Sequence, residues 1–124
     1  MLEISIYRHL RDFNLTADLT VEPGGFLILT GNNGAGKSTI LNNIAGFMSP
    51  DRGYIRVHRT VLFDSEQGIN VPPEERKIGY VFQNAAVFPH LTVHDNIAYG
   101  LKVRGVNKTQ RHQKTLELIE QSHL

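Results

Sequence analysis

A phosphate-binding loop motif constrains this chain more than any other feature. Residues 31–39 have the sequence Gly-Asn-Asn-Gly-Ala-Gly-Lys-Ser-Thr, which matches the P-loop pattern G-x-x-x-x-G-K-[ST]. Glycines let the backbone approach a phosphate closely, and the loop N–H groups form an anion-binding concavity at the start of a helix. We therefore expect Lys37 to reach the β- and γ-phosphates of a nucleotide and the Ser38 hydroxyl to bind Mg²⁺.

The residues on either side of this loop fit the same interpretation. Residues 26–30 are a short apolar run that predicts a buried strand. After the loop, apolar residues recur at helical spacing from Ile40 to Ala45, and Gly46 is a suitable helix end. The order of strand, loop and helix favours nucleotide binding over an ordinary glycine-rich turn.

Composition excludes several other classes of function. The chain has 124 residues, of which 40% are hydrophobic, and its net charge of +1 gives no support for a nucleic-acid surface. It has no cysteine, so disulfides and thiolate chemistry are excluded. Residues 1–5 lack the features of a signal peptide and no apolar run approaches a membrane span, so we expect a cytoplasmic location.

Two groups of polar residues leave alternatives open. The basic residues near the end of the chain could be a solvated helical face or a surface for an anionic partner; they are Lys102, Arg104, Lys108, Arg111 and Lys114. Six histidines are present, but only His90 and His94 are spaced for one helix face, and only if that helix begins before Thr92. We do not expect histidine to bind a metal here.

Other patterns predict the remaining elements. Residues 2–7 and 13–21 alternate in polarity and predict two half-exposed strands. Residues 54–57 and 60–63 predict a hairpin, and residues 65–76 a surface loop. Residues 78–82 are apolar and predict a second core strand.

The last third of the chain is expected to be helical. Thr92 is a suitable N-cap for one helix, and Asn107 or Thr109 could cap another helix. In that last helix, Leu116 and Ile119 are expected on the buried face.

Three segments together resemble a known family. The first is the loop at 31–39, followed by Ile-Ala-Gly-Phe at 44–47. The second is Pro-Pro-Glu-Glu-Arg-Lys-Ile-Gly-Tyr-Val-Phe-Gln at 72–83. The third is Val-Phe-Pro-His-Leu-Thr-Val at 87–93, with Asp-Asn-Ile at 95–97 and Tyr-Gly at 99–100. The chain resembles the ATP-binding subunits of ABC transporters, particularly importer ATPases of the molybdate type and their sulfate and sugar relatives.

The resemblance implies an α/β fold, namely a P-loop NTPase core with an N-terminal antiparallel β part and the start of a helical subdomain. We expect residues 1–92 to form the β-rich core portion and residues 93–124 the start of the helical subdomain. It also implies ATP and Mg²⁺ as ligands. The implied nucleotide-binding residues are Gly31, Asn32, Asn33, Gly34, Ala35, Gly36, Lys37, Ser38 and Thr39.

Further roles follow from the same resemblance. Gln83 falls at the position of the Q-loop glutamine, which can bind Mg²⁺ and help to position the attacking water. The segment Phe88–Asn96 resembles the surface that meets a membrane subunit, with Phe88 either an exposed anchor or part of the chain's own core. A second ATPase copy is the other expected partner, and assembly would place the chain at the inner face of the membrane. The family stacks an aromatic on adenine; Tyr7 and Phe13 are both candidates, although core packing of Phe13 is the simpler expectation.

The sequence also departs from the family. It does not contain the Leu-Ser-Gly-Gly-Gln signature, the Walker B aspartate, the glutamate that polarises water or the switch histidine. We therefore expect the N-terminal half of such a subunit, which binds nucleotide better than it hydrolyses it and is marginally stable or oligomeric. A non-hydrolysing nucleotide-binding fragment and another P-loop protein, such as a small-molecule kinase, are the alternatives. Residues 62–69 resemble molybdate importers, so molybdate or a related oxyanion is the expected cargo.

Overall fold

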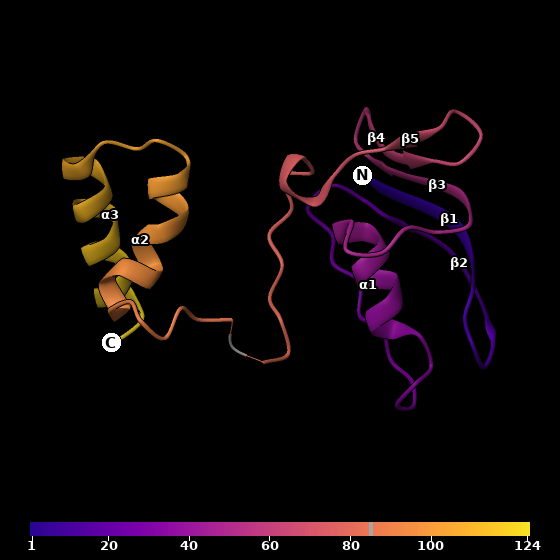
Figure 1. Cartoon of the computed structure of the whole chain (residues 1–124), viewed down its shortest axis with the longest axis horizontal. Coiled ribbons are helices and arrows are strands. Elements are labelled where there is room, and N and C mark those ends of the chain that lie inside the picture. Colours follow the sequence, from indigo (N-terminus) through magenta and orange to yellow (C-terminus); the bar gives the residue numbers. More distant parts are fainter. Residues whose placement is uncertain (85) are drawn as a thin grey trace. The chain divides into compact units, whose positions relative to one another are not determined.

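The computed structural model describes residues 1–84 and 86–124, which form two compact units. The first unit comprises Met1–Tyr80 and the second Val81–Leu124 (Figure 1). The expected boundary between the β-rich core portion (1–92) and the start of the helical subdomain (93–124) is a different division of the chain, and it remains a prediction. Within the described residues, no helix is both long and apolar enough to cross a membrane.

The first unit is built on an antiparallel sheet of five strands in the order β2-β1-β3-β4-β5. The strands are β1 (Leu2–His9), β2 (Asn14–Val21), β3 (Arg52–Val57), β4 (Thr60–Asp64) and β5 (Ile69–Asn70). Both alternating strands and the hairpin are confirmed. This sheet is the antiparallel β part that the sequence predicts.

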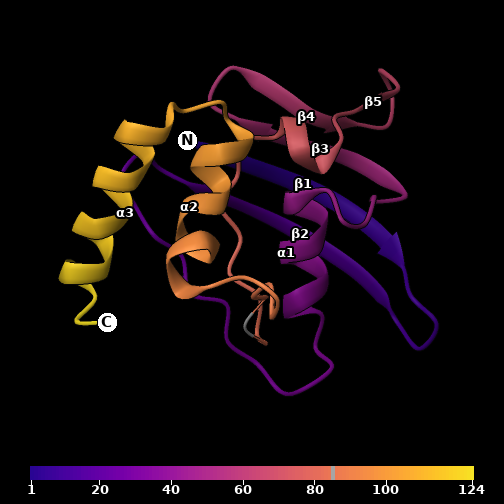
Figure 2. The ribbon, with the colours of Figure 1, turned by 60° about the vertical axis from the view of Figure 1, so that its left-hand side comes forward.

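The core of the first unit lies between this sheet and helix α1 (Lys37–Ala45). Ile4 and Ile55 are directly opposite each other on β1 and β3, and both are buried. Ile40 and Ile44 of α1 pack against this cluster, and Figure 2 shows α1 lying across one face of the sheet. Full burial of an isoleucine contributes about 1.5–3 kcal/mol, and the partly buried Ile40 and Ile44 each contribute a share of this value to holding α1 on the sheet.

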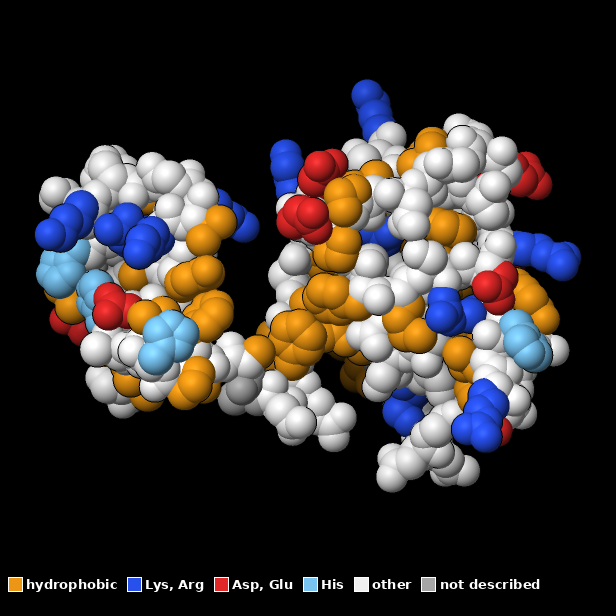
Figure 3. Space-filling view, viewed as in Figure 1, with side chains coloured by type: hydrophobic (Ala, Val, Ile, Leu, Met, Phe, Trp, Pro, Cys, Tyr) orange, Lys and Arg blue, Asp and Glu red, His pale blue; other side chains and the backbone are white. Residues whose placement is uncertain are grey.

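Two predicted strands are absent from the structure. Residues 26–30 and 78–82 form no ladder, because no described segment pairs with either of them. A strand needs such a neighbour for its backbone hydrogen bonds. Some of their apolar side chains are open to solvent, with Phe26 87% exposed and Val81 97% exposed, whereas Ile78 packs against the core of the first unit. Figure 3 shows the apolar side chains that lie open on one face of the first unit.

The predicted surface loop at 65–76 contains more structure than expected. It includes β5 and the short 3-10 helix η1 (Pro73–Glu75), and it ends on Arg76, which is buried. The loop prediction is wrong at Arg76, because this side chain binds main-chain oxygens of a distant helix.

The second unit is a pair of helices, α2 (Val93–Val103) and α3 (Lys108–Gln121). Thr92 caps α2 by accepting a hydrogen bond from the Asp95 N–H, at 3.1 Å. Asn107, rather than Thr109, caps α3 by accepting from the Gln110 N–H, at 2.9 Å. Both caps satisfy a backbone N–H that has no intrahelical partner.

The predicted buried face of α3 is only partly correct. Thr115 is fully buried, and its hydroxyl donates to the Arg111 carbonyl at 2.7 Å. Leu116 is 44% exposed and Ile119 is half-buried. The contact face of α3 is therefore centred on Thr115, and the prediction for Leu116 is wrong.

Candidate functional site

The P-loop joins the end of the irregular segment 26–30 to the amino end of α1. Gly36 is the N-cap of α1 and has φ +98°, a left-handed conformation that favours glycine. Residues 31–35 are exposed, and the Ala35 N–H donates to the Asn32 carbonyl at 3.2 Å. The loop thus presents its backbone to solvent at the positive end of a helix dipole.

The Lys37 side chain turns back over its own loop. Its ammonium donates to the carbonyl oxygens of Gly31, at 2.8 Å, and Asn32, at 2.7 Å. The first turn of α1 has no acidic residue. Within the part of the chain that the structure describes, Lys37 forms no ion pair with a carboxylate, and the geometry fits an anionic group bound at the loop.

The two hydroxyl residues of the motif follow directly in α1. Ser38 is exposed, and its position in the first turn fits an additional oxygen ligand for a cation held by phosphate. Thr39 is half-buried, and its carbonyl accepts a hydrogen bond from the Asn43 side chain at 2.7 Å. Thr39 therefore contributes to the packing of the loop's helix as well as to the motif.

An aromatic residue lies beside the loop. The Phe13 ring lies 3.5 Å from the position that a Cβ would occupy at Gly36, and this side chain is 39% exposed. The expectation that Phe13 packs in the core is therefore wrong. Tyr7 lies in β1, where the Arg52 guanidinium sits 5.8 Å from its ring centre. Of the two candidates for adenine stacking, Phe13 is the one whose ring is shown next to Gly36 of the P-loop.

Arg76 supports the far end of α1, and sequence reasoning missed it. Its guanidinium donates to the Asn43 and Ile44 carbonyls, both at 2.8 Å, and its Nε donates to the Val71 carbonyl at 2.7 Å. Burial lowers the pKa of Arg76, but an arginine remains charged under all ordinary conditions. A fixed cation at the negative end of α1 complements the helix dipole.

Gln83 and the segment Phe88–Asn96 belong to the second unit. Gln83 is exposed and lies outside any helix or strand, so its role remains a prediction. Asn96 holds the segment together: the Phe88 N–H donates to its side-chain oxygen at 2.8 Å, and its amide donates to the carbonyl oxygens of Phe88, Leu91 and Thr92. Phe88 stays 39% exposed, with its ring centre 4.4 Å from that of Tyr99.

A sequence match to a known family decides between the P-loop alternatives. Residues 15–124 match the family described as ABC transporter. The chain belongs to the ABC transporter family. The resemblance drawn from the P-loop and from the motifs at 72–83 and 87–97 is thereby confirmed.

The curated relatives of this ABC transporter chain include import proteins for two kinds of cargo. It is 48% identical over 102 residues to the molybdenum import ATP-binding protein ModC of Haemophilus ducreyi, covering 82% of this chain and 29% of that protein. It is 42% identical over 120 residues to ModC of Paramagnetospirillum magneticum, covering 96% and 33%. It is 46% identical over 102 residues to the trehalose/maltose import ATP-binding protein MalK of Thermococcus litoralis, covering 82% and 27%. The chain spans about a third of the length of these relatives.

The fold also matches a solved ATP-binding cassette. The structure, described as the dimeric post-hydrolysis state of a cassette bound to ADP and Pi, superposes with a TM-score of 0.77 at 23% identity. The match covers 100% of this chain and 58% of that chain. It confirms the predicted fold class, an incomplete ABC ATPase domain with an antiparallel sheet and helices.

Proposed function

We propose that this chain is the nucleotide-binding part of an ABC importer's ATP-binding subunit, which couples ATP hydrolysis to transport. One observation carries the proposal: an exposed P-loop ends on a left-handed glycine at the amino end of α1, with Lys37 folded over it. The residues proposed to hold the nucleotide are Gly31, Asn32, Asn33, Gly34, Ala35, Gly36, Lys37, Ser38 and Thr39.

Each part of the loop has a defined task in this proposal. The loop N–H groups and the helix dipole hold the phosphates, and Lys37 exchanges its two carbonyl acceptors for phosphate oxygens. Ser38 and Gln83 bind Mg²⁺, which neutralises developing charge during phosphoryl transfer. Phe13 is proposed to stack on adenine, because it lies against Gly36 of the loop.

The cargo and the partners are proposed from the relatives and from the second unit. Molybdate or a related oxyanion is the proposed cargo, since two of the relatives are named as molybdenum import proteins. The segment Phe88–Asn96, with Phe88 exposed, is proposed to contact a membrane subunit at the inner face of the membrane. A second ATPase subunit is the other proposed partner, in line with the dimeric state of the matched cassette.

We further propose that residues 1–92 and 93–124 belong to the core and helical parts of the cassette. The described chain contains no Leu-Ser-Gly-Gly-Gln sequence, so on its own it should hold nucleotide with negligible turnover. The second candidate function is that of a protein that binds nucleotide without hydrolysing it. The two candidates differ in one result, because the assembled subunit hydrolyses ATP under the first and does not under the second.

The decisive experiment measures ATP binding with Mg²⁺ for the wild type, for Lys37→Ala and for Lys114→Ala, followed by turnover on the same samples. Lys114 is exposed on α3 and serves as a control for the loss of one lysine charge. We expect the first substitution to weaken binding at least ten-fold and the control to leave it unchanged. Equal affinity in all three proteins would refute the proposed role of the P-loop.

A further inference from the structure

A second candidate site lies in the helical unit, and no residue of the P-loop lines it. A cavity of about 490 Å³ opens between α2 and α3. Three permanently charged cations line it: Lys102 from α2, and Lys108 and Arg111 from α3. Figure 3 shows blue Lys and Arg side chains and pale blue His side chains gathered over this unit. These residues are part of the basic group that the sequence left unexplained.

The cations of this cavity are poorly compensated by acidic groups. Asp95 is the one carboxylate among the lining residues, and its pKa is lowered by hydrogen bonds from Thr92 and His94 and by the charges of His94 and Lys102. Among the described residues, Lys102, Lys108 and Arg111 form no ion pair with a carboxylate. With neutral imidazoles the lining therefore carries a net charge of about +2, because one carboxylate offsets one of the three cations.

The arrangement at the start of α3 increases this imbalance. Lys108 is the first residue of α3 and Arg111 is one turn further on, and the first turn has no acidic residue. Cations at the amino end of a helix are unfavourable next to the positive end of its dipole. One Arg111 N–H donates to the Val106 carbonyl at 3.2 Å, and a guanidinium has five donors, so others remain for a ligand. If this part of α3 were only a solvated helix face, nothing would require cations at its unfavourable amino end.

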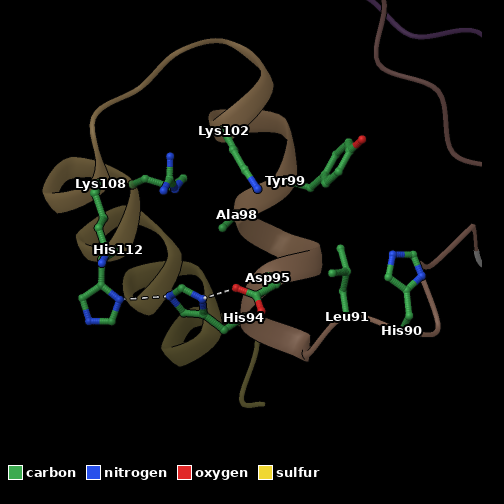
Figure 4. A pocket seen from close by; sticks show the side chains of 10 residues that line it. His90, Leu91, His94, Asp95, Ala98, Tyr99, Lys102, Lys108 and His112 are labelled. Atoms are coloured by element: carbon green, nitrogen blue, oxygen red, sulfur yellow. Dashed lines mark hydrogen bonds and ion pairs between the residues drawn. The ribbon is translucent and has the colours of Figure 1, made fainter.

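Two histidines connect the helices across the cavity. His94 Nδ1 lies 3.3 Å from Asp95 Oδ1, and His94 Nε2 lies 3.0 Å from His112 Nδ1. Figure 4 shows the row of Asp95, His94 and His112 running from one helix to the other. A neutral imidazole has one donor and one acceptor, so His94 can donate to Asp95 while accepting from His112.

We propose that this cavity binds a phosphate-class oxyanion through Lys102, Lys108 and Arg111, next to the His94–His112 pair that lines the same cavity. An oxyanion supplies the missing negative charge and accepts several N–H donors at once. A free oxyanion and the phosphate group of a lipid headgroup share this chemistry. The site needs no residue of the P-loop, so it is independent of nucleotide binding.

The experiment titrates inorganic phosphate into the full chain carrying Lys37→Ala, which removes phosphate binding at the P-loop. Chloride keeps the ionic strength constant, and NMR records the imidazole ¹⁵N signals of His94 and His112. We expect saturable shifts of both signals. The double substitution Lys108→Gln/Arg111→Gln should weaken the fitted affinity at least ten-fold.

The matched control is Arg104→Gln/Lys114→Gln, which removes the same charge from exposed residues of the same unit that do not line the cavity. It should change the affinity less than two-fold. Lys102→Gln, on the other helix, is a second test and should weaken binding several-fold even if the double variant is unfolded. Equal weakening by the test and control pairs would mean general charge screening and overturn the proposal.

A second arm separates the two sources of the oxyanion. Co-sedimentation compares vesicles of phosphatidylglycerol with vesicles of phosphatidylcholine. Binding to phosphatidylglycerol that is lost in Lys108→Gln/Arg111→Gln identifies a lipid headgroup, whereas saturable phosphate binding without vesicle binding identifies a free oxyanion. Absence of both overturns the proposal.

Discussion

Arg76 occupies the space in which a side chain at Gly46 would have to sit. A Cβ at position 46 would lie 2.6 Å from Arg76 Nε and 2.9 Å from its Cζ. Gly46 caps α1 with φ +89°, and its N–H donates to the Asn42 carbonyl at 3.0 Å. The glycine and the buried arginine thus form one unit that ends the P-loop helix.

We predict that Gly46→Ala lowers the free energy of unfolding by about 2–5 kcal/mol. The left-handed backbone costs about 1–2 kcal/mol for a residue with a Cβ, and the clash with Arg76 adds about 1–3 kcal/mol. Urea unfolding of the wild type and of the variant measures the difference.

Gly24→Ala is the matched control, because Gly24 has φ +73° and no atom near its Cβ position. It should cost only the backbone component of about 1–2 kcal/mol. In the Arg76→Ala background the extra cost of Gly46→Ala should disappear. If both glycine variants lose the same stability, Arg76 does not fill the space beside Gly46.

We predict that Phe13→Ala weakens ATP binding by about ten-fold, in line with the value of about 1–3 kcal/mol for base–aromatic stacking. Inorganic tripolyphosphate should bind the variant as well as it binds the wild type, because it has no base to stack. Isothermal titration with both ligands makes the comparison. Tyr7→Ala is the control and should leave ATP affinity within two-fold, since the Tyr7 ring faces Arg52. The reverse ranking would assign the stacking role to Tyr7.

The elements that depend on local interactions were predictable from the sequence. The caps Thr92 and Asn107 accept from N–H groups three residues away, so their chemistry is visible in a short window. The P-loop is similar, because its glycines, its lysine and its helix are contiguous. The strand β3 and its hairpin partner also lie close together in the sequence.

Features that depend on distant residues could not be predicted in the same way. Residues 26–30 have the composition of a buried strand, but a strand also needs a neighbour, and none of the described segments pairs with them. Arg76 binds carbonyls 32 and 33 residues away. His112 meets His94 across 18 residues, so inspection of single-helix spacing found only His90 and His94. The position of Phe13 beside Gly36 likewise depends on how β2 and α1 pack.

We predict that Asp95→Asn removes a pH dependence of stability in the acid range. The folded-state pKa of Asp95 is lowered from its usual value of 3.8, first by hydrogen bonding from Thr92 and then by His94. A carboxylate with a lowered pKa contributes stability above the unfolded pKa, and this contribution is lost as pH falls through the folded pKa. The wild type should therefore lose more stability than the variant between about pH 5 and pH 2.

Thermal unfolding at half-unit pH steps measures this difference. Glu117→Gln is the control, because Glu117 is an exposed carboxylate on α3 that accepts a hydrogen bond from Gln113. Its pH profile should follow that of the wild type. Parallel profiles for the wild type and Asp95→Asn would contradict the prediction.

We predict that Asn96→Ala releases the segment from Phe88 to Thr92 without unfolding α2. The Asn96 side chain accepts from the Phe88 N–H and donates to three carbonyls of this segment. Each net hydrogen bond contributes about 0.5–1.5 kcal/mol. The two N–H groups of the amide are shared among three carbonyls, and most of these contacts are exposed to water. We therefore count the loss as that of about two bonds, which lowers the local opening free energy by about 1–3 kcal/mol. Hydrogen exchange at the amides of Phe88 and Leu91 should accelerate about 5–150-fold, whereas exchange in the middle of α2 should change little.

Gln113→Ala is the control. It removes an exposed amide that contacts only Glu117 among the described hydrogen bonds, and it should leave both regions unchanged. Uniform acceleration through α2 would instead show that Asn96 stabilises the helix itself, and the exposed position of Phe88 would then depend on other contacts.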